Sequence, residues 1–330
     1  ASDADMYNTA VGYGSGQSVT TGTNNTLIGG LAGDAITTAS NNSALGFNSF
    51  SANTTGENNV ALGSYALNQN TTAANNTAVG HFALTANTTG ATSTAVGASA
   101  LAANTTGAEN TAVGHVALAT NTTGASNTAF GRASLNANTT ASYNTAYGTD
   151  TLQVNTTGAN NTATGYRALF VNTTAANNTA VGYFALTANT TGASNTANGY
   201  GSLITNTTGV QNTALGVSAL NSNITGSYNV GVGASGGYYV TGSGNISIGS
   251  RNNAGTYAPV NDITSQNNYL SMGHTAVTNA YVKVAWTVTS DARDKSNFAD
   301  VPHGLSFVNQ LAPYSYEFKL DREEAETDGI

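Results

Sequence analysis

A repeat with a 17-residue period runs through most of this chain and restricts its fold more than any other feature. Glycine recurs at this spacing, and each of these glycines ends a short run of mostly apolar residues. A typical unit, residues 76–92, reads NTAVGHFALTANTTGAT. Internal repeats of this kind are typical of solenoids, in which each unit packs only against its neighbours. The recurring glycines are Gly12, Gly29, Gly46, Gly63, Gly80, Gly97, Gly114, Gly131, Gly148, Gly165, Gly182, Gly199, Gly216 and Gly233, followed by Gly249, which is displaced by one position.

The residue types within each unit predict short strands and turns rather than helices. Apart from two larger residues, a unit consists mainly of alanine, threonine, asparagine and glycine, and a segment so rich in turn formers cannot hold a pair of helices. Stacked coils of a β-solenoid place equivalent residues about 4.8 Å apart, so fourteen coils would form a rod on the order of 65 Å long. We therefore predict an all-β fold, a repetitive β-solenoid or β-roll of 17-residue coils.

Two columns of larger residues form the predicted core. One coil encloses little apolar area, and at roughly 25 cal/mol per Å² its burial barely offsets the entropy of ordering the chain. We therefore expect additional burial in a parallel homotrimer, an elongated fibre whose contacts between chains also shield the sheet edges. The first column precedes the repeat glycine and includes Val79, Val96, Val113, Phe130, Val181 and Leu215. The second stands four positions after that glycine and consists of Leu67, Leu84, Leu101, Leu118, Leu135, Leu152, Leu169, Leu186, Leu203 and Leu220.

Polar residues also recur in columns. Aligned asparagines are expected to form amide ladders along the rod. The glycines of the NTTG segments, such as Gly90 and Gly107, are expected at turns that need a positive φ, although Ala73, Ala141 and Ala175 take their place in other units. The first asparagine column is Asn76, Asn110, Asn127, Asn144, Asn161 and Asn178, and the second is Asn70, Asn87, Asn104, Asn121, Asn138 and Asn155.

The charge and composition of the chain argue against several classes of partner. Only 7% of the residues are charged, the formal net charge is -8, and the basic residues before Arg251 are Arg132 and Arg167. A nucleic-acid groove needs several cations to neutralise phosphates, so we expect no nucleic-acid partner. We also expect no membrane insertion, because no apolar run approaches roughly 20 residues. The absence of cysteine excludes a disulfide framework and a thiolate metal site, and we expect no cofactor.

Few residues of the repeat region carry chemistry. Glu57 and Glu109 lie three coils apart, too far within one chain for the paired carboxylates of glycoside hydrolysis. His81 and His115 lie two coils apart and cannot share a metal within one chain. We therefore expect no metal site and no activity on external substrates. Aromatic residues after the repeat glycine form a column that we interpret as packing against a neighbouring chain, with stacking on sugars as the alternative. They are Tyr13, Phe47, Tyr166, Tyr183 and Tyr200.

Two parts of the chain resemble known families. The units NTAVGHFALTANTTG and NTALGVSALNSNITG resemble repeats of phage tail fibres and, more loosely, the head repeats of trimeric autotransporter adhesins, which are trimers of left-handed parallel β-rolls. Residues 284–318, VAWTVTSDARDKSNFADVPHGLSFVNQLAPYSYEF, resemble the entry to the intramolecular chaperone domain of endosialidases and phage tail fibres, the peptidase S74 family. This second resemblance implies a domain that trimerises the fibre while it folds and then cuts itself off.

The resemblance to the S74 family also implies catalytic residues. In that family a serine in an S-D-x-R-x-K motif is activated by the lysine five positions later, and the bond before the serine breaks. Ser290, Asp291, Arg293 and Lys295 match this motif position by position. A lysine with a lowered pKa can take the proton of a serine hydroxyl, so a dyad of Ser290 and Lys295 could cleave the chain after Thr289.

These observations predict three segments. They are a solenoid shaft in residues 1–250, a transition and trimerisation region in residues 251–289, and the N-terminal part of an S74-type chaperone domain in residues 290–330. The expected function is that of a phage tail-fibre shaft in the virion, which mediates attachment to the host surface. Its expected partners are two further copies of itself, a host cell-surface glycan or protein receptor, and other virion tail proteins. Receptor-binding residues are not assigned.

Two other functions stay open. A bacterial adhesin located on the cell surface, or a fibre of a phage-like contractile injection system, would use the same shaft. An ice-binding solenoid is a third class, because threonine ladders on a flat face can match an ordered water lattice. Against it, the threonines lie in turn-like NTTG segments, and the assembly domain would have no role. Thermal hysteresis in a freezing assay would discriminate this class from the others.

Overall fold

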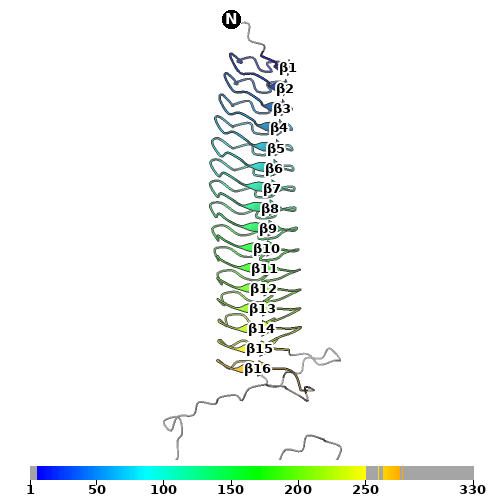
Figure 1. Cartoon of the computed structure of the whole chain (residues 1–330), viewed down its shortest axis with the longest axis vertical. Coiled ribbons are helices and arrows are strands. Elements are labelled where there is room, and N and C mark those ends of the chain that lie inside the picture. Colours follow the sequence, from blue (N-terminus) through cyan, green and yellow to red (C-terminus); the bar gives the residue numbers. More distant parts are fainter. Residues whose placement is uncertain (1–5, 250–258, 260–262, 276, 278–330) are drawn as a thin grey trace, which may run out of the picture. The chain divides into compact units, whose positions relative to one another are not determined.

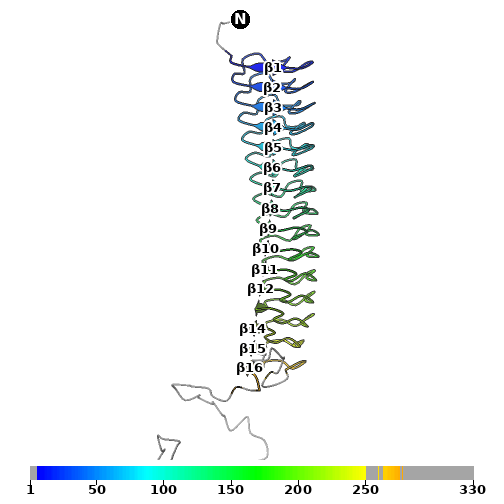
Figure 2. The same ribbon diagram turned by 90° about the vertical axis from the view of Figure 1, so that its right-hand side faces the viewer.

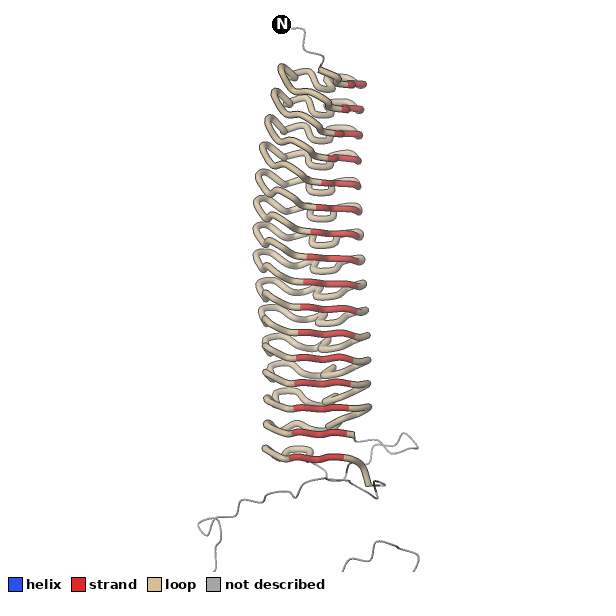
Figure 3. The backbone as a smooth tube through the Cα atoms, in the orientation of Figure 1, coloured by secondary structure: helices blue, strands red, loops and turns tan. Residues whose placement is uncertain are grey.

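The repeat folds as a single stack of coils. The structure, a computed structural model, describes residues 6–249, 259, 263–275 and 277. Each coil contributes one three-residue strand to a parallel sheet of sixteen strands, and the strands follow one another in chain order (Figures 1 and 3). No helix occurs in these residues, so the predicted all-β solenoid is confirmed. The strands are β1 (Thr9–Val11), β2 (Thr26–Ile28), β3 (Ser43–Leu45), β4 (Val60–Leu62), β5 (Thr77–Val79), β6 (Thr94–Val96), β7 (Thr111–Val113), β8 (Thr128–Phe130), β9 (Thr145–Tyr147), β10 (Thr162–Thr164), β11 (Thr179–Val181), β12 (Thr196–Asn198), β13 (Thr213–Leu215), β14 (Val230–Val232), β15 (Ile246–Ile248) and β16 (Leu270–Met272).

The pairing register reproduces the sequence repeat. Thr77 of β5 pairs with Thr94 of β6, Ala78 with Ala95, and Val79 with Val96, so each residue pairs with its equivalent in the next unit. We number the positions of a coil from the asparagine before its strand, so that residues 76–92 occupy positions 1 to 17 and the strand occupies positions 2 to 4. The last steps are irregular, since Val230 pairs with Ile246, one position short of a full repeat, and Ile246 pairs with Leu270 beyond a longer connection. The described coils therefore stack regularly along one axis up to β14 (Figure 2).

One of the two predicted core columns lies outside the core. The leucines at position 9, such as Leu84, are fully buried, as expected. The column before the repeat glycine is not, because Val96 at position 4 exposes 36% of its surface while Ala95 beside it is buried. Side chains alternate between the two faces of a strand, so a three-residue strand that points its middle residue inward must point both flanking residues outward.

The core combines leucine with small and amide side chains. Position 3 and position 8 carry alanine in most coils, as at Ala78 and Ala83, and both columns are buried. Asparagines at positions 1 and 12 are also buried, as at Asn76 and Asn87. The coil is narrow because only one large side chain per coil separates its walls.

The predicted amide ladders are confirmed. In the column at position 12, Asn104 Nδ2 donates to Asn87 Oδ1 of the preceding coil (2.9 Å) and to the carbonyl oxygen of Gly107 in its own coil (2.9 Å). In the column at position 1, the backbone N–H of Asn127 donates to Asn110 Oδ1 (3.0 Å). These bonds satisfy buried amides that would otherwise be costly, and they link each coil to the next.

The turns use positive φ at other positions than expected. The glycines of the NTTG segments are not in the positive-φ region, so that expectation is wrong. Gly90 is instead placed where a Cβ would lie 2.4 Å from the carbonyl oxygen of Gly107 in the next coil. Positive φ occurs at Gly80 (φ +137), at positions 7 and 9, as in Phe82 (φ 57) and Leu84 (φ 50), and at position 17.

The coil of β2 fills its core from a different position than most coils do. Leu27 occupies position 3, where most coils have alanine, and Gly33 occupies position 9, where most have leucine. A Cβ at Gly33 would lie 2.8 Å from both Leu27 Cδ2 and Ile36 Cδ1. The large side chain has therefore moved to the other wall, and the core stays filled.

The second of the two units into which the chain divides, Asn279–Ile330, lies outside the described residues. So do the predicted chaperone segment, 290–330, and much of the predicted transition region, 251–289. Strand β16, which pairs in parallel with β15, falls inside that transition region. In the described part of the chain, no helix is long and apolar enough to cross a membrane.

Candidate functional site: the strand-end ridge

Large apolar side chains gather on one outer stripe of the solenoid. We define the strand-end ridge as the side chains at position 4, where each strand ends, and at position 6, two positions later. Position 4 faces outward, and it carries a polar residue in two coils, Thr164 and Asn198. In the other coils it carries Val11, Ile28, Leu45, Leu62, Val79, Val96, Val113, Phe130, Tyr147, Val181, Leu215, Val232, Ile248 and Met272.

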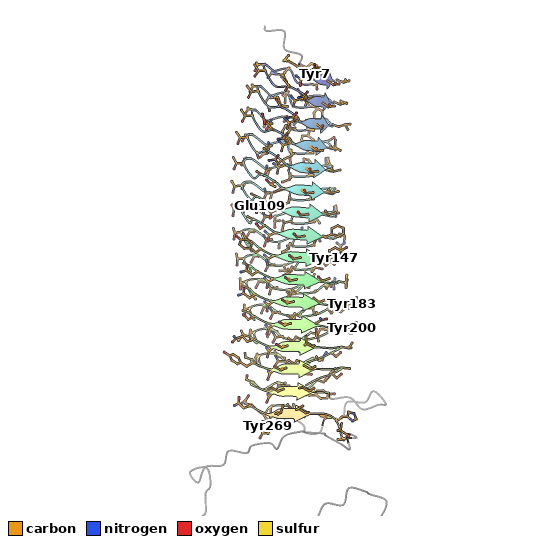
Figure 4. The ribbon with its side chains drawn as sticks, viewed as in Figure 1. Tyr7, Glu109, Tyr147, Tyr183, Tyr200 and Tyr269 are labelled. Atoms are coloured by element: carbon orange, nitrogen blue, oxygen red, sulfur yellow. The ribbon has the colours of Figure 1, made fainter. Side chains whose placement is uncertain are left out.

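Many of the ridge side chains are substantially exposed in a single chain. Leu45 exposes 52% of its surface and Tyr147 exposes 54%. Tyr147, Tyr183 and Tyr200 lie along the side where the strands end, whereas Glu109 lies on the side where they begin (Figure 4). Single exposed apolar residues are normal in folded proteins, but a continuous stripe of them marks an interaction surface.

The aromatic residues of the ridge stack on one another along the rod. The rings of Phe130 and Tyr147, both at position 4, have centroids 4.8 Å apart and planes 9° apart. At position 6, Tyr183 stacks on Tyr200 at 5.4 Å and 6°, and Tyr166 stacks on Tyr183 at 5.2 Å. Because neighbouring rings cover much of each other's faces, chiefly the ring edges remain for a partner.

A second aromatic cluster lies nearer the N-terminus. Tyr65 and Phe82, at position 7, stack at 5.0 Å, and Phe47 contacts the edge of Tyr65 at 5.6 Å. His81 lies 4.0 Å from the Phe82 ring and 6.4 Å from the Tyr65 ring. His81 therefore contacts two aromatic rings while it remains exposed to solvent. The aromatic residues at position 7 were not singled out by the sequence analysis, although their 17-residue spacing from one another was visible.

An ion cluster interrupts the ridge between the aromatic pairs. Asp150 at position 7 has a side chain only 5% exposed, and Arg132 Nη2 donates to both of its carboxylate oxygens, at 2.7 and 2.9 Å. Arg167 Nε lies 3.8 Å from Asp150 Oδ2, and its guanidinium lies over the rings of Tyr166 and Phe170. The cluster bridges three successive coils. Sequence reasoning missed it because the three residues occupy positions 6 and 7 of different coils.

The acids and histidines considered for catalysis or metal binding do not assemble into a site. Glu109 Oε2 accepts a hydrogen bond from Ser126 Oγ (3.0 Å) in the next coil, on the side of the rod away from the ridge. In the region that the structure describes, no group of three histidine, cysteine, aspartate or glutamate side chains could hold a metal ion.

Threonines line the strands as well as the turns. Position 2 carries threonine in most strands, as at Thr77, Thr94 and Thr111, and its side chain points outward beside the ridge. The threonines are therefore not confined to the NTTG turns. The outer face of the strands therefore presents a column of threonines at position 2 beside a column of mostly apolar residues at position 4. The bulky rings of Phe130 and Tyr147 project from the second column.

The four residues of the predicted self-cleavage motif, Ser290, Asp291, Arg293 and Lys295, lie outside the described residues. Comparison with known families covers this part of the chain. Residues 290–329 match the model of the Peptidase_S74 family, described as chaperone of endosialidase. The matched segment begins at Ser290 and therefore includes the whole motif.

The fold and this match define a class of protein. A parallel β-solenoid precedes a segment similar to the endosialidase chaperone, and this combination is consistent with a phage tail fibre that carries a C-terminal chaperone. The match covers the C-terminal end of the chain and not the solenoid. No curated protein matches the chain.

Proposed function

We propose that the chain forms the shaft of a homotrimeric phage tail fibre and that its C-terminal segment assembles this fibre. The observation that carries the proposal is the endosialidase-chaperone match directly after a long repetitive solenoid. In this proposal residues 1–250 form the shaft, residues 251–289 lead into the trimerisation region, and residues 290–330 begin the chaperone domain. The fibre belongs to the virion and presents a surface that binds a glycan or protein receptor on the host.

The construction of the shaft suits a rigid spacer. Backbone hydrogen bonds join successive coils on several sides, for example from Leu84 N–H to the Ala100 carbonyl and from Thr88 N–H to the Thr105 carbonyl. Most coils also contribute two buried amides to the ladders. A stack of coils stabilised by such nearest-neighbour contacts extends in one dimension, which is what a fibre requires.

The proposed maturation step is cleavage before Ser290. Lys295 takes the proton of the Ser290 hydroxyl, and Ser290 Oγ attacks the carbonyl carbon of Thr289. The bond from that carbon to the Ser290 nitrogen breaks, the nitrogen receives the proton, and an ester joins Thr289 to Ser290 Oγ. Water then hydrolyses the ester to a Thr289 carboxylate and a free Ser290 hydroxyl. One water is consumed and no external substrate is involved.

The cleavage is tested by the mass of the full-length protein under denaturing conditions. We expect the wild-type shaft to end at Thr289 and the Ser290→Ala and Lys295→Met variants to remain whole. Ser296→Ala, one position beyond the lysine, is the matched control and should be cut like the wild type. An intact wild-type chain would overturn the self-cleavage and leave the chaperone role to be judged from the oligomeric state.

Two alternatives use the same shaft. A bacterial surface adhesin or a fibre of a phage-like contractile injection system differs in what lies at the ends of the rod. For ice binding, the rank of threonines at position 2 is a favourable observation, as at Thr77 and Thr94. The projecting rings of Phe130 and Tyr147 oppose it, because they break the flatness that an ice-matching face needs. We expect no thermal hysteresis from the purified shaft.

A further inference from the structure

We propose that the strand-end ridge is the face through which three parallel, in-register copies of this chain contact one another. This inference rests on the proposed trimeric fibre and names the residues that hold its shafts together. The partner that covers the ridge of one chain is the same ridge of another copy of this chain.

The large apolar residues of the repeat are concentrated on this face. Their column at position 4 is the one that the sequence assigned to the core, and in a single chain it faces outward. The side of the coil formed by positions 13 to 17 carries threonine, glycine, alanine, asparagine and serine in most coils. Ile224, Tyr143 and Tyr228 are bulky exposed exceptions on that side. In most coils the bulky outward residues nevertheless follow one stripe, which is the pattern of a surface buried by assembly rather than one exposed to water.

The exposed area of the ridge is large enough for a stable interface. Six tyrosine and phenylalanine side chains of the ridge expose between 43% and 87% of their surfaces. Because a side chain of this size can bury about 150–250 Å², these six alone present roughly 600 Å². The exposed aliphatic side chains of the ridge add to this area, and each partner contributes roughly 800 Å² to a stable interface. The stripe runs from β1 to β16, so this area is spread along the whole rod. An interface of this form joins the shafts over their full described length.

The changing character of position 4 along the rod favours one register of the copies. This position carries valine in β5, β6 and β7, aromatic rings in β8 and β9, and Asn198 in β12. When the copies are parallel and in register, the residue at position 4 of each coil contacts the same residue of the other chains. Asn198 then faces the Asn198 amides of the other chains and can share hydrogen bonds with them. A shifted or antiparallel arrangement would bury Asn198 against apolar side chains, which costs free energy because its amide would be unpaired.

The orientation of the aromatic rings favours another copy of the chain over a glycan as the partner that covers the ridge. A sugar stacks on the face of an aromatic ring, and the faces of Tyr183 and Tyr200 are turned toward each other, with planes 6° apart. The edges that remain suit packing against the edges and methyl groups of another chain.

The test uses single cysteines, because the chain contains none. Val96→Cys places a thiol on the ridge, and Thr106→Cys places one at exposed position 14 of the same coil, away from the ridge. In full-length protein that native mass shows to be trimeric, we expect maleimide to label Val96→Cys at least ten-fold more slowly than Thr106→Cys. After denaturation the two rates should be equal. A second pair from one coil, Leu215→Cys and Thr225→Cys, gives the same comparison if the first variant does not assemble.

The register is tested by crosslinking. A short bis-maleimide should join Asn198→Cys chains into dimers within the trimer and leave the position 14 control, Thr191→Cys, uncrosslinked. Equal labelling of ridge and control thiols in a proven trimer, or no crosslink at Asn198→Cys, would overturn this inference and leave the trimeric fibre standing. A native mass that shows only monomer would instead overturn the proposed function and this inference with it.

Discussion

At the scale of single residues, the two glycine columns of the coil differ in what they require. Gly80 at position 5 combines a positive φ with a close approach, since a Cβ would lie 2.5 Å from the carbonyl oxygen of Gly97. Gly90 at position 15 has the close approach alone. Ala73, Ala141 and Ala175 occupy position 15 in other coils, so small local shifts there make room for a methyl group.

We expect Gly80→Ala to be much more damaging than Gly90→Ala, in the same coil. The first substitution adds backbone strain of about 1–3 kcal/mol to a clash with backbone atoms. The second should cost less than about 1 kcal/mol, because any loss is partly offset by the lower entropy of the unfolded chain. Thermal unfolding midpoints of the two variants measure the difference, and equal midpoints would show that φ does not matter at position 5.

The amide ladder makes a second prediction at this scale. Asn121 Nδ2 donates to Asn104 Oδ1 and to the Gly124 carbonyl, while its Oδ1 accepts from Asn138. Asn121→Asp keeps the shape but replaces the donor with an oxygen facing two acceptors in a buried site. We expect a loss of at least about 1–3 kcal/mol in the free energy of unfolding.

The matched control for the ladder is Asn160→Asp, at exposed position 17. Aspartate tolerates the positive φ of that position nearly as well as asparagine, so its unfolding midpoint should barely change. If the two aspartate variants unfold at the same temperature, the ladder does not contribute to stability.

At the scale of the coil, the core is a fixed volume that different positions can fill. In most coils leucine at position 9 fills it, whereas in the coil of β2 Leu27 fills it from position 3 and Gly33 leaves the space free. Interiors are close-packed, so a large residue at both positions is overpacked and a small residue at both leaves a cavity.

A double-mutant cycle tests this exchange. Leu27→Ala alone opens a cavity and should cost about 2–5 kcal/mol, and Gly33→Leu alone should strain the core against Leu27 and Ile36. Together they place alanine at position 3 and leucine at position 9, as in most coils, while Ile36 still occupies position 12 in place of asparagine. Leu27→Ala removes one of the two side chains that the new leucine meets, so we expect the double variant to be more stable than the sum of the two losses, with a coupling of about 0.5–3 kcal/mol. Additive losses measured by thermal unfolding would contradict the compensation.

The strand also shows which parts of the coil were predictable from sequence. The leucine column and both asparagine ladders followed from spacing, because identical residues one repeat apart must stack in a solenoid. The Val79 side chain was wrongly predicted to point into the core, because only its hydrophobicity was considered. Side chains of a strand alternate between its two faces, and the small Ala78 between two larger residues marks the inward position. The Arg132–Asp150–Arg167 cluster could not be predicted, because it depends on side-chain reach between coils.

At the scale of the whole molecule, the shaft behaves as a one-dimensional stack. Each strand pairs only with its immediate neighbours in the sequence, and the register repeats without change from β1 to β14. A whole number of coils can therefore be removed without changing the environment of the others.

Deletion of residues 110–126 removes one coil and joins Glu109 to Asn127 in the same register. We expect a folded fibre about 4.8 Å shorter, with an unfolding midpoint close to that of the wild type. Deletion of residues 110–118, at the same site but only a fraction of a coil, should misalign every later column and prevent assembly. Circular dichroism and native mass distinguish these results, and equal tolerance of both deletions would contradict the stacked register.

The most direct test of the fibre as a whole is electron cryomicroscopy of the full-length protein after assembly. We expect a rod with threefold symmetry, in which three parallel solenoids with coils about 4.8 Å apart turn their strand-end ridges toward the common axis. Isolated single solenoids, or three shafts whose ridges face the solvent, would contradict it.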